Sequence, residues 1–152
     1  MIRARSSAVS ICGVAPVPVG EKGADIDHIV IGPAGVFTLN TKNHSKSRVT
    51  VTQHGIYVNG QRTDYLRNSR FEAKRANKLL SAACGNIEVQ PVIVIMAADL
   101  KFNSEPTDVN VVGRRSIARW LTTRPATLTP ERVEEIFVQA HRDTTWKPKF
   151  DH

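Results

Sequence analysis

Residues 25–42 decide the fold, and they read Asp25-Ile-Asp27-His-Ile-Val-Ile-Gly32-Pro-Ala-Gly35-Val-Phe-Thr-Leu-Asn40-Thr-Lys42. The pattern predicts two short strands around a Gly-Pro-Ala-Gly turn. Each strand carries polar residues at positions where a buried strand normally carries Val or Leu. Because a buried polar group costs free energy unless it finds a partner, Asp, Asn and Lys in this hairpin indicate a chemical site.

The register of this hairpin decides which polar side chains meet. Side chains alternate across a strand, so Asn40 and Lys42 share one face. Pairing the two turn glycines at 32 and 35 puts Asp27 opposite Asn40. Opposed residues of an antiparallel pair have Cβ atoms about 4.5–5.5 Å apart. This register therefore predicts a cluster of Asp27, Asn40 and Lys42, and a slip of one residue would scatter it.

Composition bounds the class of protein. The 152 residues suffice for one domain with a core, and we expect a single domain over 1–152. No apolar run is long enough to cross a membrane. Cys12 and Cys84 make no disulfide framework, so a reduced, cytoplasmic setting is expected. The net charge of +7 favours a polyanionic partner such as DNA or RNA, with a merely solvated basic surface as the alternative.

The rest of the chain predicts an α/β domain in layers. Strands are expected at 8–15, 48–52, 56–58, 89–97 and 108–112. Helices are expected at 65–84, 116–121 and from Thr129 to about 142. Gly85 is a plausible residue to close the first helix. Thr129-Pro130 supplies an N-cap and a first helical residue for the last one.

The helix predicted at 65–84 carries an acid on its inward face. Glu72 is the only acid on the stripe formed with Ala76, Leu80 and their neighbours. An inward carboxylate needs a cation, hydrogen bonds or a metal. The other sides of the helix carry basic residues, namely Arg67, Arg70, Lys74, Arg75 and Lys78.

Several of these segments together resemble one known family. The hairpin with Thr41-Lys42-Asn43, the Val58-Asn59-Gly60 turn, the stretch from Tyr65 to Ala73, the strand at 89–96 and Trp120-Leu121 are similar to the nuclease-related domain (NERD), especially in its actinobacterial versions. The resemblance covers most of the chain. It implies a restriction-endonuclease-like, PD-(D/E)xK core with a central mixed β-sheet flanked by helices.

The resemblance also implies site residues and a cofactor. Asp27 would be the first acid, Lys42 the lysine that orients or activates water, and Asn40 would occupy the second acid position. Mg²⁺ or Mn²⁺ would be held by Asp27, Asn40 and Glu72. In many family members the position of Glu72 is Gln, which makes a structural or substrate-binding variant the alternative for Glu72. From the residues alone, a buried salt bridge with Lys42 or an arginine is the alternative to a metal ligand.

Two departures from the family pattern bear on activity. Asn40 offers a neutral oxygen where the family has a charged one, which weakens metal binding unless Glu72 compensates. The family usually begins with a helix carrying a Gly-Glu pair, and this chain is expected to lack it. Histidines 28, 44 and 54 show no zinc-ligand spacing.

Three functions follow as hypotheses. The first is a Mg²⁺-dependent nuclease acting on DNA or RNA. The second is a catalytically impaired nucleic-acid-binding module, which Asn40 favours. The third is an interaction domain without nucleic acid. In the first two, the phosphate backbone would contact Asn68, Arg67, Arg70, Lys74, Arg75 and Lys78.

Overall fold

The computed structural model describes residues 2–3, 10–12 and 28–146. The strands are β1 (Ile2–Arg3), β2 (Ser10–Cys12), β3 (His28–Gly32), β4 (Gly35–Val51), β5 (Ile56–Val58), β6 (Gln61–Arg62), β7 (Val89–Phe102) and β8 (Asn110–Gly113). The helices are α1 (Tyr65–Cys84), α2 (Ile117–Thr122), α3 (Pro130–Ala140) and α4 (Asp143–Trp146). No helix in this part of the chain is both long and apolar enough to cross a membrane.

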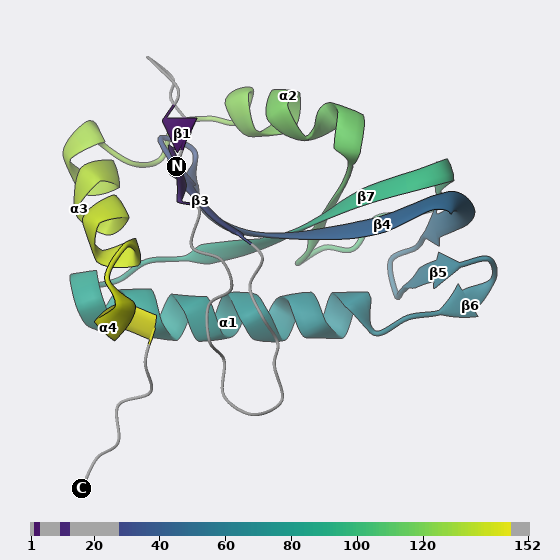
Figure 1. Ribbon diagram of the computed structural model, residues 1–152, viewed down its shortest axis with the longest axis horizontal. Coiled ribbons are helices and arrows are strands. Elements are labelled where there is room, and N and C mark those ends of the chain that lie inside the picture. Colours follow the sequence, from purple (N-terminus) through teal and green to yellow (C-terminus); the bar gives the residue numbers. More distant parts are fainter. Residues whose placement is uncertain (1, 4–9, 13–27, 147–152) are drawn as a thin grey trace, which may run out of the picture.

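The strands form one mixed sheet around β4. Strand β4 pairs antiparallel with β3 along its first part and with β5 at its end, while β7 runs parallel to it on the other side. Strand β8 is parallel to β7. Figure 1 shows α2 over one face of the sheet and the long helix α1 along the other, with α3 and α4 near one end of α1. The predicted α/β architecture, a mixed sheet flanked by helices, is confirmed.

The predicted hairpin register is confirmed over the residues described. The ladder between β3 and β4 runs from Gly32↔Gly35 to His28↔Leu39. Gly35 has a φ of 136°, a backbone conformation that side-chain-bearing residues rarely adopt, so glycine is needed at this turn. Asp27 and the turn predicted up to residue 24 lie outside the described residues.

Strand β4 is much longer than the hairpin alone predicts. It continues to Val51, so residues 48–51 are extended as predicted, but they form the end of β4 and not a separate strand. The cause is β7, which also extends beyond its predicted end and pairs with β4 from Val36↔Val89 to Val51↔Phe102. The pairing of β4 with β7 has one irregularity, a register shift between His44 and Arg48 in the polar middle of the strand.

The helices largely follow their local signals. Helix α1 covers the predicted residues and ends at Cys84, with Gly85 as its C-cap at a φ of 83°. At the start of α3 the hydroxyl of Thr129 accepts a hydrogen bond from the backbone N–H of Arg132 (3.2 Å). Helix α3 ends at Ala140, two residues before its predicted end, and the short helix α4, which was not predicted, follows.

The apolar core lies on both faces of the sheet. Under α2, Val30, Phe37 and Val92 pack with Leu121, and Phe37 meets Trp120 edge-on at 5.6 Å between ring centroids. On the opposite face, α1 packs its buried stripe against the sheet. Helices α3 and α4 complete that second layer with their own buried residues, namely Ile136, Phe137, Ala140 and Trp146. The core thus holds α1 at a defined position over β4.

Candidate functional site

A buried polar pair joins the centre of β4 to α1. Asn40 and Glu72 are each only 6% exposed. The amide Nδ2 of Asn40 donates a hydrogen bond to Oε2 of Glu72. A buried carboxylate is tolerated when it receives such bonds. Two of the predicted site residues, 32 positions apart in the chain, are therefore brought together, and Glu72 points inward as its helical spacing predicts.

A second contact between β4 and α1 lies further along the strand. Lys42 and His44 follow Asn40 at two-residue intervals, so they share its face. The Lys42 amine stands 4.7 Å from the centroid of the Tyr65 ring. The Nε2 atom of His44 lies 2.7 Å from the Tyr65 hydroxyl, and the two rings stack at 5.8 Å. Burial raises the pKa of the Tyr65 phenol, so its hydroxyl keeps its proton at neutral pH.

Helix α1 runs antiparallel to β4 across this site. Glu72 meets Asn40 near one end, and Tyr65 meets His44 at the other. Ser69 lies between them along the helix and is 2% exposed. Its hydroxyl is fully buried and has no hydrogen-bond partner within the described part of the chain. Because buried hydroxyls are nearly always satisfied, this one marks a place where a ligand or water would gain a contact.

The site contains residues that sequence reasoning missed. The alternation that places Asn40 and Lys42 on one face of the strand also places His44 there. Tyr65 and Ser69 precede Glu72 by seven and three residues, which is the spacing of one helix face. Both signals were present in the sequence.

The oxygen donors at this site are of the types that bind a hard divalent cation, but together they carry little negative charge. The Glu72 carboxylate, the Asn40 amide oxygen and the Ser69 hydroxyl are the donor types that Mg²⁺ accepts, and Mg²⁺ commonly takes one or two carboxylates with water and phosphate. Among the described residues no three His, Cys, Asp or Glu side chains gather as a metal site. Of Glu72, Asn40 and Ser69, only Glu72 would bring a negative charge to a cation.

The basic residues of α1 differ in their surroundings. Arg67 pairs with Asp64 at 3.0 Å. Arg70 makes two hydrogen bonds to Asp108, at 2.6 and 3.0 Å. Arg75 is half-buried, and burial lowers the pKa of its guanidinium. The remaining predicted phosphate contacts, Asn68, Lys74 and Lys78, are exposed.

The Arg70–Asp108 pair predicts a small, pH-dependent effect on stability. The hydrogen bond from Arg70 is the main cause that lowers the pKa of Asp108. A carboxyl whose pKa is lowered in the folded state contributes stability above its unfolded pKa of about 3.9 and loses it as the pH falls further. Since the two side chains are 43% and 55% exposed, we expect Asp108→Asn to cost at most about 1 kcal/mol at neutral pH.

Urea denaturation of Asp108→Asn and wild type at neutral pH and at about pH 3 tests this. The gap between the two proteins should narrow at acid pH. Asp99→Asn, at an exposed residue of β7, is the matched control and should have no measurable effect. A gap that widens on acidification would contradict the assignment.

Cys84 has no features of a catalytic nucleophile. Burial is the main cause that raises the pKa of its thiol, and the nearby Arg132 opposes this only in part. A raised pKa leaves less thiolate at neutral pH. Catalysis by Cys84 is therefore not supported.

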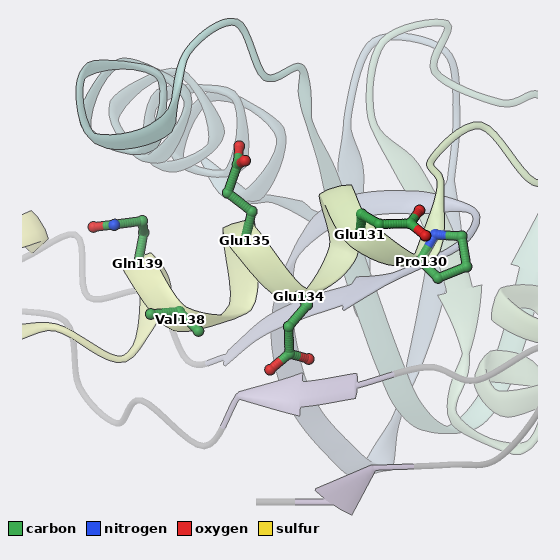
Figure 2. Close-up of a pocket in the computed structure, with 6 residues that line it drawn as sticks. All are labelled: Pro130, Glu131, Glu134, Glu135, Val138 and Gln139. Carbon is green, nitrogen blue, oxygen red and sulfur yellow. The ribbon is translucent and has the colours of Figure 1, made fainter.

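A hollow along α3 has the opposite charge to α1. Its lining residues are Pro130, Glu131, Glu134, Glu135, Val138 and Gln139. Figure 2 shows the three glutamates spread along this helix. Glu135 forms an ion pair with Arg132. Such an acidic surface repels a polyanion.

Comparison with known families agrees with the geometry. The family model described as nuclease-related domain (NERD) matches residues 12–96, more than half of the chain. The matched region contains β3, β4, α1 and most of β7, and therefore every residue of the polar site. No curated protein and no solved structure gives a significant match.

Proposed function

Because the chain belongs to the nuclease-related domain family, we propose that it is a metal-dependent nuclease that hydrolyses phosphodiester bonds of DNA or RNA. The observation that carries this proposal is the buried Asn40–Glu72 pair, with Lys42 next along the same face of β4. A carboxylate that can hold a metal ion, with an amine on the same strand face, supplies functional groups that such a hydrolysis can use.

Glu72 and Asn40, together with Asp27, would hold Mg²⁺ or Mn²⁺. Asp27 is included because the hairpin register expected from the sequence pairs it with Asn40, and the described ladder follows that register as far as His28↔Leu39. A bound divalent cation stabilises negative charge on the phosphate and lowers the pKa of water. Asn40 orients the Glu72 carboxylate through its amide hydrogen bond.

Lys42 would position the attacking water and the phosphate. Its amine is held over the Tyr65 ring, a contact that restricts a flexible side chain. The hydrogen bond between Tyr65 and His44 fixes that ring in turn. Tyr65 and His44 therefore act as positioning residues for Lys42.

Replacing Lys42 tests the proposal. Purified protein should nick supercoiled plasmid in Mg²⁺ or Mn²⁺, and Lys42→Ala should lower the rate about a hundredfold or more, the usual scale for a positioned proton-transfer group. Lys46→Ala is the matched control, since Lys46 is an exposed lysine of the same strand. Cleavage by Lys42→Ala at the wild-type rate would refute the assignment.

A second function is favoured by one observation. Asn40, at the position where the family places an acid, already uses its amide to satisfy Glu72. In a nucleic-acid-binding module that has lost catalysis, the Asn40–Glu72 pair would have only a structural role. It would bind DNA or RNA in a salt-dependent manner that chelators do not change. Metal-dependent turnover in the plasmid assay would reject it.

A further inference from the structure

An aromatic side chain is exposed in the middle of the basic helix. Phe71 is 59% exposed, more than any other large hydrophobic residue in the described ranges. It follows directly after Arg70 and precedes Glu72, which points the other way into the buried site. Water contact at so large an apolar ring is unfavourable, so burial of this ring against a partner would release free energy.

Charged residues surround Phe71 on its helix face. Arg67, Lys74 and Lys78 stand four residues before it and three and seven residues after it, which places them on the same side. Helix α1 contains five basic residues and a single acid, Glu72, which is buried on the opposite side. Lys74 and Lys78 form no ion pair with any residue that the structure describes. This face of the helix thus presents one exposed aromatic ring surrounded by basic side chains.

We propose that this outer face of α1, formed by Phe71 with Arg67, Lys74 and Lys78, binds single-stranded nucleic acid. Phe71 stacks on an unpaired base, and the three basic side chains contact the flanking phosphates. The inference rests on the proposed function in that the partner is a nucleic acid. It adds the strandedness of that partner and a residue that recognises it.

The chemistry of the face favours a single strand over other polyanions. The bases of a duplex are stacked on one another, so they offer no free face to Phe71, whereas a single strand does. A protein partner would need a wider apolar patch, yet the neighbours of Phe71 at helical spacing are Arg67, Asn68, Lys74 and Arg75. A single aromatic ring flanked by basic side chains therefore matches a single unpaired base flanked by phosphates.

Binding of fluorescent oligonucleotides to the full chain tests the proposal. A single-stranded oligothymidylate of about 12 nucleotides is compared with a duplex of equal length by anisotropy, at low salt and in EDTA. Phe71→Ala removes one base–aromatic stack, so its affinity for the single strand should be about 5- to 100-fold lower than that of wild type. Its affinity for the duplex should change by less than about twofold. Phe102→Ala removes another exposed phenylalanine, at the end of β7, and should change neither.

Phe71→Trp provides the rescue. It should restore single-strand affinity, because an indole stacks as well as a phenyl ring, and its fluorescence should be quenched by the bound base. Single-strand affinity unchanged in Phe71→Ala, an equal loss for both oligonucleotides, or no binding by wild type would each overturn the proposal. The use of EDTA separates this result from catalysis, so failure of the nuclease assay would leave the binding proposal standing.

Discussion

Asn40→Asp is expected to lower the free energy of unfolding of the metal-free protein by about 3–5 kcal/mol, the scale seen when a buried charge loses its partner. Asp has nearly the shape of Asn, so the change is electrostatic. It replaces the amide that donates to Glu72 by a second carboxylate, and both positions are only 6% exposed. Two buried carboxylates in contact cannot both ionise without a large cost.

The dependence on pH and metal gives this prediction its specificity. The close carboxylates raise each other's pKa in the folded state, so the variant should recover stability as the pH falls and lose it as the pH rises. Mg²⁺ or Mn²⁺ should recover stability at neutral pH, because a ligand that binds only the folded state stabilises it. If the missing charge alone limits catalysis, the variant should also cleave plasmid faster than wild type.

Urea denaturation in EDTA and in millimolar Mg²⁺ measures both effects. Asn43→Asp makes the same chemical change at an exposed residue of β4 and should alter stability by less than about 0.5 kcal/mol. Wild-type stability of Asn40→Asp in EDTA at neutral pH would show that the Asn40–Glu72 contact is not maintained.

Trp146→Ala is expected to cost about 3–5 kcal/mol, the usual range for removing a large buried aromatic side chain. Trp146 is 2% exposed, and its indole N–H donates to the backbone oxygen of Ala140 at 2.9 Å. It packs into the cluster that also holds Ala76 and Leu80 of α1 and Ile29 of β3. The residue lies well beyond residues 12–96, so the family region shares its core with the helices that follow.

Thermal denaturation tests this dependence. A chain of this size shifts its Tm by roughly 2–4 °C per kcal/mol, so Trp146→Ala should melt about 10 °C lower. Val138→Ala is the control, since Val138 is 48% exposed on α3 and lines the hollow shown in Figure 2. A melting temperature near that of wild type would mean that α4 contributes little to the core. Loss of α4 packing should also loosen α1, which carries Glu72 on one side and Phe71 on the other.

Local signals in the sequence determined several elements of this protein correctly. The turn glycines and the alternation of side chains predicted the register of β3 and β4, because both act between near neighbours. The stripe around Glu72 predicted which face of α1 points inward, and Gly85 predicted where the helix ends. Thr129-Pro130 predicted the start of α3. Each of these features depends on residues only a few positions apart.

Only the tertiary structure decided the length of β4 and the partner of Glu72. Strand β4 extends through its polar middle because β7, which follows some 50 residues later, pairs with it in parallel. The contacts of Asn40 with Glu72 and of His44 with Tyr65 depend on where α1 lies on the sheet. That position is set by the packing of α1 against the sheet and against α3 and α4, to which residues throughout the chain contribute. A pattern within one segment cannot specify such long-range contacts, so the sequence predicted which side chains face inward, and the fold determined which of them meet.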